Sequence, residues 1–185
     1  MSRIIRSRTN EDGPILTVSA VRRIADDTVE LDFGTGLPAG FGVGDTVENA
    51  DYQCAATFRG NVVRNNRARG VLFTTPKPVV CESNVFDHVS GAAILFAGDA
   101  QGWYESGACE NLLISDNVFR DCLTSRFQFC DGIISFYPMV KDLAAQRTRY
   151  HRNVRIVGNR FETFDVPLLF AISCSNLVFR GNEVV

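Results

Sequence analysis

The stretch Leu112-Leu113-Ile114-Ser115-Asp116-Asn117-Val118-Phe119 decides the fold, because a version of it returns along the chain. Each copy has a small or acidic residue, then Asn, then any residue, then Val or Phe. The copies are Gly60-Asn61-Val62-Val63, Ser83-Asn84-Val85-Phe86, Asp116-Asn117-Val118-Phe119, Gly158-Asn159-Arg160-Phe161 and Gly181-Asn182-Glu183-Val184. Their asparagines are 23, 33, 42 and 23 residues apart, so the basal period is 23 residues and two units are longer by 10 and 19. A repeat of this length indicates stacked units in which each contacts its neighbours.

Short apolar runs lie on both sides of the repeated motif. Runs before the asparagines are 79–80, 112–114, 154–157 and 177–179, and runs after a polar corner are 71–73, 93–96, 133–136 and 168–170. Runs this short, rich in β-branched and aromatic residues and bounded by Gly, Asn and Pro, are typical of strands. The sequence therefore predicts a right-handed parallel β-helix whose coils contain an asparagine turn and two short strands. We attribute the recurrence of Asn to its tolerance of the left-handed conformation that a tight corner requires.

A second set of equivalent positions in successive coils supports the stacking. Cys109 and Asn111, His151 and Asn153, and Cys174 and Asn176 stand eight and six residues before successive turn asparagines. Equivalent residues of successive coils lie about 4.8 Å apart, so like residues pack on like. We therefore interpret Cys109, His151 and Cys174 as one interior column, with a metal or redox site as the alternative. The six cysteines form no CxxC pair, and neither a metal nor another cofactor is expected.

Length and composition restrict the other possibilities. The 185 residues are 45% hydrophobic and 22% charged, which indicates one globular domain with, at most, a small extension. A net charge of −2 and scattered arginines give no reason to expect nucleic acid as a partner. No apolar run approaches the roughly 20 residues of a membrane span, so no membrane is expected either. The first residues do not resemble a signal peptide.

The first fifty residues differ from the rest. We expect strands at 15–18, 29–33 and 45–48 with a Gly/Pro-rich loop at 34–44, and we divide the chain into an extension, 1–50, and coils, 51–185. The extension is interpreted as the remnant of an accessory β domain or as a cap, because the end of a β-helix exposes a sheet edge. An uncovered end would allow self-association.

Two long loops follow equivalent strands in neighbouring coils. One runs from Gly98 to Gly107 and the other from Pro138 to about residue 149, and we expect Asp99 and Pro138 to be equivalent. Both loops should therefore leave one edge and wall one groove.

The first of these loops is the more informative. It holds the only Trp of the chain, Trp103, beside Tyr104, together with Asp99 and Glu105. Sugar sites present an aromatic face to a pyranose ring, and glycoside cleavage uses paired carboxylates as acid and base or nucleophile. The alternative is a solvated loop whose Trp103 covers the edge of the core.

Asp131 is a third candidate carboxylate. An alignment of the second strands places Arg69, Ala92, Asp131 and Val166 in one column, so that Asp131 lies beside a small residue with a cation beyond it. This arrangement suits the floor of a ligand site. The alternative is a polar corner residue before Gly132.

At these residues the sequence resembles glycoside hydrolase family 110, the exo-acting α-1,3-galactosidases that include members cleaving blood-group-B antigen. The matching stretches are Asn66-Arg67-Ala68-Arg69-Gly70-Val71-Leu72, Ala92-Ala93-Ile94-Leu95, Gly98-Asp99-Ala100, Trp103-Tyr104-Glu105-Ser106-Gly107, Gly132-Ile133-Ile134-Ser135 and Pro138. The resemblance covers residues 15 to 185, a partial-length β-helix portion of the family.

The resemblance implies a secreted or periplasmic bacterial enzyme that removes terminal α-linked galactose from a glycan with inversion and without a metal. Asp99, Glu105 and Asp131 would then be the catalytic carboxylates, and Trp103, Tyr104, Arg69 and Arg67 would contact the sugar. Met139 departs from the pattern, because members often carry an acidic residue after the matched proline. A carbohydrate-binding module without catalysis and a structural β-helix module are the alternatives.

Overall fold

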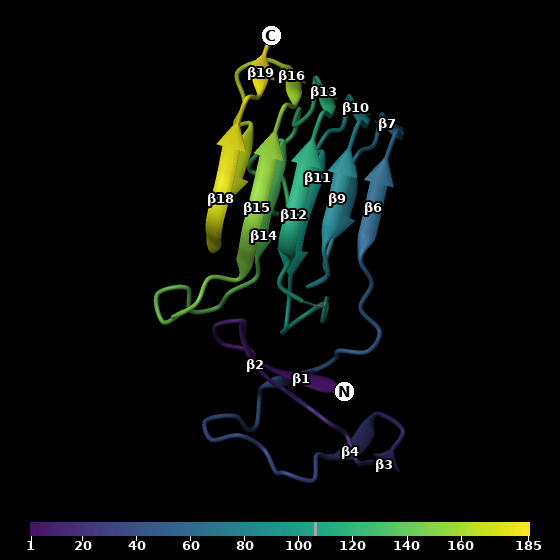
Figure 1. Ribbon diagram of the computed structural model, residues 1–185, viewed down its shortest axis with the longest axis vertical. Helices are drawn as coiled ribbons and strands as arrows, with labels where there is room; N and C mark the ends of the chain where they lie inside the picture. Colours follow the sequence, from purple (N-terminus) through teal and green to yellow (C-terminus); the bar gives the residue numbers. More distant parts are fainter. Residues whose placement is uncertain (106) are drawn as a thin grey trace.

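The computed structural model describes residues 1–105 and 107–185 and consists of strands and turns. Three parallel sheets form a stack of coils, and an antiparallel sheet with a hairpin lies beside it (Figure 1). The expected parallel, all-β architecture is therefore confirmed, whereas the right-handed sense of the coil stays a prediction. No helix within these two ranges is long and apolar enough to span a membrane.

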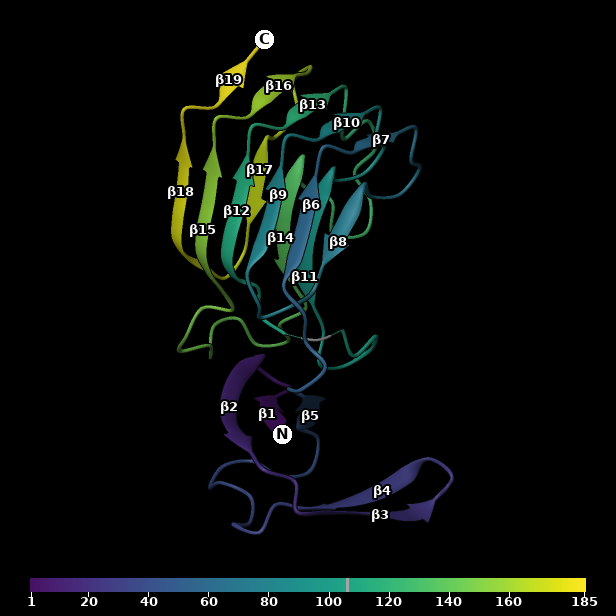
Figure 2. The same cartoon turned by 45° about the vertical axis from the view of Figure 1, so that its right-hand side comes forward.

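Each of the first four coils contributes one strand to each of the three sheets, and the last coil contributes strands to the first two sheets. The first sheet contains β6 (Ala56–Arg59), β9 (Val79–Glu82), β12 (Glu110–Ser115), β15 (His151–Val157) and β18 (Cys174–Arg180). The second contains β7 (Val62–Arg64), β10 (Val85–Asp87), β13 (Val118–Arg120), β16 (Arg160–Glu162) and β19 (Glu183–Val184). The third contains β8 (Val71–Phe73), β11 (Ile94–Gly98), β14 (Ile134–Pro138) and β17 (Leu169–Ala171). Figure 2 shows the three layers side by side.

The prediction of two strands per coil is wrong by one strand. The Val and Phe residues that follow each asparagine pair with each other along the stack, for example Val85 with Val62 and with Val118. They therefore form a sheet of their own, where we expected only a turn. Three residues are enough for a strand here because both neighbouring coils supply ladder hydrogen bonds.

The interior of the stack is filled by columns of identical side chains. Phe86, Phe119 and Phe161 stack with ring centroids 5.3 and 4.8 Å apart. On the inner face of the third sheet, Phe96 stacks on Phe136 at 4.5 Å. All five rings are fully buried, and such stacked aromatic pairs stabilise the core beyond the burial of their area. The expectation that like residues pack on like is confirmed.

The turn asparagines have a different role from the one we assigned. The residue before each asparagine has the left-handed conformation, with φ of +66° at Gly60, +54° at Ser83 and +55° at Asp116. The asparagine side chain instead points inward and joins a buried amide ladder. In that ladder Asn117 Nδ2 donates to Asn159 Oδ1 at 2.9 Å, and Asn84 Nδ2 donates to Asn117 Oδ1 at 2.9 Å. The ladder, and not the backbone angle, explains why Asn recurs.

The asparagines of the second set of equivalent positions do have the expected conformation. Asn111, Asn153 and Asn176 have φ of +58°, +57° and +51°. Their side chains form an outer ladder, in which Asn153 Nδ2 donates to Asn111 Oδ1 at 3.1 Å. Tolerance of left-handed angles therefore accounts for this second set.

The N-terminal residues form a small antiparallel sheet and a hairpin. The sheet has the order β2-β1-β5, from β2 (Glu11–Leu16), β1 (Ser2–Arg6) and β5 (Thr46–Asn49), and the hairpin pairs β3 (Ala20–Ala25) with β4 (Thr28–Asp32). In both ribbon views the sheet lies below the strand ends of the stack, next to the long loops (Figures 1 and 2). In these views it lies beside the stack rather than over the first or the last coil.

Candidate functional site

Both long loops leave the stack at the same corner. Gly98 at the end of β11 pairs with Pro138 at the end of β14, and the chain then leaves the sheet as residues 99–107, here loop 1, and 139–150, here loop 2. The predicted common edge is confirmed. The register is one residue away from the expected one, so Met139, rather than Pro138, takes the position equivalent to Asp99.

A polar hollow of about 290 Å³ lies over the outer face of β8, β11 and β14. Four predicted site residues meet there, Arg69 from the first coil and Asp99, Trp103 and Glu105 from loop 1. Gln128 adds a polar side chain to the three charged ones, Arg69, Asp99 and Glu105. The remaining walls are apolar, formed by Leu72, Leu95, Ala97, Phe129, Tyr137 and Met139.

An apolar hollow of about 530 Å³ continues from it between the two loops. Five residues line both hollows, namely Asp99, Trp103, Phe129, Tyr137 and Met139. The apolar hollow adds Gln101, Gly102, Pro138, Val140, Lys141, Leu143 and Ile172. Together the hollows form one groove, as expected from the position of the loops, and its size is that of ordinary small-molecule sites.

Asp99 holds loop 1 in shape. Its side chain is buried, at 4% exposure, and its carboxylate accepts backbone N–H bonds from Gln101 at 2.7 Å, Gly102 at 3.0 Å and Trp103 at 2.7 Å. The Asp99 N–H also donates to the Glu105 carbonyl at 3.1 Å, which closes the loop by an isolated antiparallel bridge. Asp99 therefore fixes the direction in which Trp103 and Glu105 point.

Glu105 presents the freer carboxylate. It is half-buried in the wall of the polar hollow, and within residues 1–105 and 107–185 neither a hydrogen-bond donor nor a cation engages its carboxylate. Trp103, 79% exposed, lies on the same loop at the boundary between the two hollows. A carboxylate without a structural partner beside an exposed ring is available to a ligand.

The other predicted residues lie outside the groove. Tyr104 lines another hollow, between loop 1 and the N-terminal sheet, which Asp99 and Glu105 also line, and Arg67 is exposed. Asp131 lines neither hollow of the groove. Its predicted column is wrong by one residue, because Ile94 pairs with Ile134, and continuing that register places Ala92 beside Gly132.

Hydrogen bonds from the N-terminal residues fix the backbone of both loops. Thr46 Oγ1 donates to the Ala100 carbonyl at 2.7 Å, and Asn10 Nδ2 donates to the Met139 carbonyl at 3.0 Å. Gln101 Nε2 reaches back from loop 1 to the Ser7 carbonyl at 2.6 Å. The N-terminal sheet therefore positions one side of the groove.

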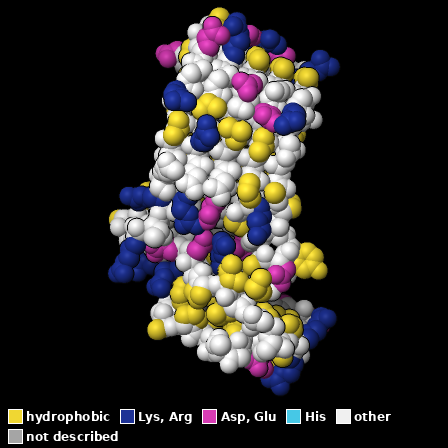
Figure 3. All heavy atoms as spheres, in the orientation of Figure 1, with side chains coloured by type: hydrophobic (Ala, Val, Ile, Leu, Met, Phe, Trp, Pro, Cys, Tyr) yellow, Lys and Arg dark blue, Asp and Glu magenta, His cyan; other side chains and the backbone are white. Residues whose placement is uncertain are grey.

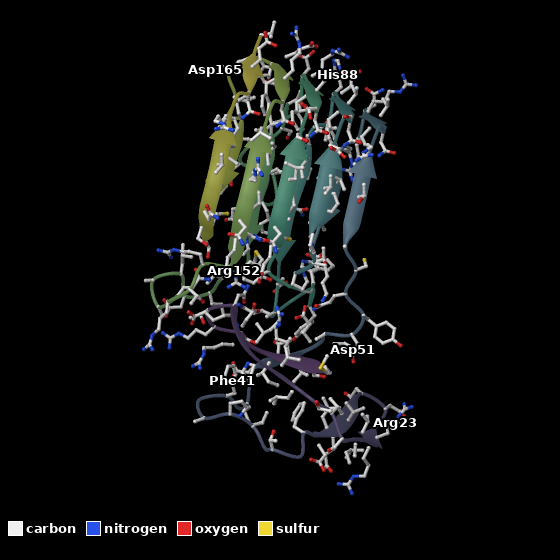
Figure 4. The ribbon with its side chains drawn as sticks, viewed as in Figure 1. Arg23, Phe41, Asp51, His88, Arg152 and Asp165 are labelled. Atoms are coloured by element: carbon white, nitrogen blue, oxygen red, sulfur yellow. The ribbon has the colours of Figure 1, made fainter. Side chains whose placement is uncertain are left out.

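A half-buried ion cluster reinforces this junction. Asp12 bonds Arg3 at 3.1 Å and Arg152 at 3.4 Å, and Arg152 also pairs with Glu110. Figure 3 shows charged side chains gathered where the stack meets the N-terminal part, and Figure 4 places Arg152 at the end of the stack nearest that part. Burial raises the pKa of Asp12, although Arg3 and Arg152 act in the opposite direction.

Cys109, His151 and Cys174 form one interior column, as predicted. His151 pairs with Cys174, and its Nδ1 accepts the Cys109 N–H at 3.2 Å. Complete burial lowers the pKa of His151 to about 3, and burial raises the pKa of both thiols to about 12, so all three are neutral at pH 7. No cluster of three or more His, Cys, Asp or Glu that could hold a metal ion occurs among the described residues.

Comparison with known proteins gives a consistent result. The chain is 55% identical over 184 residues to the alpha-1,3-galactosidase B of Akkermansia muciniphila, a match that covers 99% of this chain and 23% of that protein. This chain is homologous to one part of the bacterial alpha-1,3-galactosidases. It is also 51% identical over 143 residues to the alpha-1,3-galactosidase B of Parabacteroides distasonis, and 38% identical over 182 residues to an alpha-1,3-galactosidase A of Bacteroides fragilis. No family model matches the chain.

The resemblance found in the sequence is therefore confirmed, for a part of those proteins. The chain spans about a quarter of the length of the curated relatives, 23% of the first two and 30% of the third. Relatives of both the A and the B type match it, so this portion is common to both named groups.

Sequence reasoning missed the aromatic and apolar walls of the groove. Phe129 and Tyr137 contact each other with ring centroids 5.2 Å apart and line both hollows. Phe129 comes from the corner at 121–133, which has thirteen residues where the equivalent corners at 65–70, 88–93 and 163–168 have six. The 42-residue spacing exceeds the period by 19 residues, and the predicted loop 2, residues 138 to about 149, accounts for only part of that excess.

Proposed function

We propose that this chain forms the substrate groove of an enzyme that hydrolyses terminal α-linked galactosides. The observation that carries the proposal is the meeting of Arg69, Trp103 and Glu105 in one hollow, although Arg69 comes from a different coil. A cation, an exposed aromatic face and an unengaged carboxylate are the groups that bind a sugar and act on its glycosidic bond. Homology to alpha-1,3-galactosidases supports this function over other glycan chemistry.

In the proposed reaction, one carboxylic acid donates its proton to the glycosidic oxygen as the bond from that oxygen to the anomeric carbon breaks. A second carboxylate takes a proton from the water that attacks the opposite face of that carbon, which gives inversion. We assign one of these roles to Glu105. Asp99 is the other carboxylate that lines the same hollow, but its bonds to Gln101, Gly102 and Trp103 give it a positioning role as well.

The setting of the reaction is part of the proposal. Bacterial relatives that act on galactosides and the glycan substrate implied by them favour a place outside the cytoplasm, in the periplasm or the medium. The substrate would be a galactose-terminated glycan.

A second candidate function is glycan binding without turnover. Met139 favours it, because this apolar side chain takes the position equivalent to Asp99 in the next coil and lines both hollows. A carboxylate at that position could have served as the second member of the pair. In this case the groove would hold galactose without cleaving it.

Galactose release from an α-1,3-galactosyl disaccharide separates the two functions. We expect wild type to release galactose, and Glu105→Gln to reduce the rate by about 100-fold or more, the range that general acid–base groups contribute. Asp26→Asn, an exposed carboxylate in the turn of the hairpin, is the matched control and should leave the rate unchanged. Binding of galactose without release would establish the second function, and absence of both from folded protein would refute the first and the second.

A further inference from the structure

Loop 2 forms one wall of the groove although it contains no strand. Residues 139–150 make turns and bends, and Met139, Lys141 and Leu143 of this loop line the groove. The bonds within the loop are those of short turns, such as the one from Gln146 N to the Leu143 carbonyl at 3.3 Å. Short turns shape a chain locally but do not fix it against its surroundings. The position of this wall therefore depends on contacts from outside the loop.

The turn between β1 and β2 supplies such contacts. Asp142 N donates to the Arg8 carbonyl at 3.0 Å, and Gln146 Nε2 donates to the Thr9 carbonyl at 2.9 Å. In both ribbon views this turn lies against loop 2 (Figures 1 and 2). Thr9 and Asn10 are only 3% and 1% exposed, whereas the residues of a turn normally face water, so the contact is tight.

Glu11 holds the far end of the loop. Its Oε1 atom accepts the N–H groups of Arg147 and Thr148 at 2.6 and 2.8 Å, and its Oε2 atom accepts the Thr9 hydroxyl at 2.9 Å. Burial acts to raise the pKa of Glu11, but the N–H bonds from Thr148 and Arg147 outweigh it and lower that pKa, so the carboxylate is charged at pH 7. Because Glu11 begins β2, which pairs with β1, its own backbone is fixed by a sheet.

Loop 1 is held by other residues. Thr46 Oγ1 donates to the Ala100 carbonyl at 2.7 Å, and Gln101 Nε2 donates to the Ser7 carbonyl at 2.6 Å. The carboxylate of Asp99 fixes the rest of that loop from within. None of these three anchors belongs to residues 8–11, so loss of the Glu11 carboxylate should release loop 2 and leave loop 1 in place.

We infer that Glu11 is a positioning residue of the groove. Its carboxylate binds the backbone of Arg147 and Thr148 and thereby holds the wall formed by Met139, Lys141 and Leu143 against loop 1. Glu11 itself does not line the groove and acts only through loop 2. The inference rests on the proposed function, because the position of this wall matters only if the groove holds a galactoside.

Trypsin cleavage after Lys141 reports the position of loop 2 without any need for activity. Lys141 is exposed and lies at the opposite end of the loop from Thr148, so its cleavage reflects the whole loop. We expect Glu11→Ala to accelerate this cut about tenfold relative to the cut after the exposed Arg67, and Glu11→Gln, which keeps an acceptor oxygen, to accelerate it less than about twofold. Glu30→Ala, at an exposed carboxylate of the hairpin, is the matched control and should leave the ratio unchanged.

The kinetics of galactose release separate positioning from a general loss of structure. Glu11→Ala should raise KM for an α-1,3-galactosyl disaccharide about tenfold and change kcat less than about twofold, because one wall moves while Glu105 stays in place. Glu11→Gln should return KM to near the wild-type value. A variant that is merely less well folded would show a lower kcat at unchanged KM, because only its active fraction falls.

The outcomes decide this inference apart from the function on which it rests. Faster cleavage after Lys141 together with a higher KM in Glu11→Ala, both reversed in Glu11→Gln, supports it. Cleavage at the wild-type rate, faster cleavage at unchanged KM, or a Glu11→Gln variant that behaves like Glu11→Ala overturns it. If wild type binds galactose without turnover, Kd takes the place of KM. If wild type neither binds nor releases galactose, the proposed function fails, and the rate at Lys141 alone decides whether Glu11 holds loop 2.

Discussion

Removal of one asparagine side chain from the buried amide ladder should be among the single changes that most reduce the stability of the coil stack. Asn117 is 1% exposed, and its side chain makes four hydrogen bonds. Its Oδ1 accepts from Asn84 N at 3.0 Å and Asn84 Nδ2 at 2.9 Å, and its Nδ2 donates to the Cys81 carbonyl and to Asn159 Oδ1, both at 2.9 Å. In Asn117→Ala the two Asn84 donors lose their acceptor inside the core, where water does not replace it.

The magnitude follows from the groups left without a partner. A buried donor or acceptor without a hydrogen bond costs roughly 1–3 kcal/mol, so two orphaned donors and two weakened acceptors predict a loss of about 3–5 kcal/mol in the free energy of unfolding. Asn182→Ala is the matched control, because Asn182 also accepts from Asn159 N and Nδ2, but it is half-buried at the last coil. Water can replace part of its bonds, and about 1–2 kcal/mol is expected there.

Urea unfolding followed by circular dichroism measures both losses. We expect the same dependence on urea for both variants, and a midpoint that falls more for Asn117→Ala than for Asn182→Ala. Equal losses, or a loss below about 1 kcal/mol for Asn117→Ala, would refute the view that buried amide bonds are the reason for the repeat.

Two further predictions concern the corner below the stack. His151 is neutral in the folded protein, because burial lowers its pKa to about 3. In the unfolded chain the same side chain binds a proton near pH 6.5. Its contribution to the free energy of unfolding is therefore fully present above pH 6.5 and is lost as the pH falls toward 3. The loss between pH 7 and pH 5 should be about 2 kcal/mol in wild type and absent from His151→Gln, as judged by urea unfolding at the two pH values. Gly98→Ala would place a methyl group against the hydroxyl of the buried Tyr150 and should cost about 1–3 kcal/mol, whereas Gly42→Ala, with open space around it, should cost little in the same thermal-melting assay.

The sequence was sufficient for the architecture because the period and the turn motif both depend on nearest-neighbour packing. Columns such as Phe86-Phe119-Phe161 could be aligned by hand from the asparagines. The third strand of each coil was missed since three residues give no periodic signal of their own. The role of Asn was misjudged because the positive φ belongs to the residue before it, and only the interior ladder separates these two explanations.

The site could be predicted in part. The positions of the loops predicted a groove, and Asp99, Trp103 and Glu105 of loop 1 line it together with Arg69 of the first coil, while their roles stay predictions. Asp131 was misplaced because an alignment of short strands has no internal check against a shift of one residue, and such a shift changes the face on which a side chain lies. Nothing local in the sequence marks Phe129, which reaches the groove only because a corner in another part of the coil folds over the sheet.

The amide ladder also gives the stack a direction. In each pair the Nδ2 group of one asparagine donates to the Oδ1 atom of the asparagine in the next coil. The order is Asn61, Asn84, Asn117, Asn159 and Asn182. Any strand added beyond the first coil must therefore bring donors, and any strand added beyond the last must bring acceptors. Within this ladder unlike ends are complementary and identical ends are not, so a coil that extends the ladder must join it head to tail.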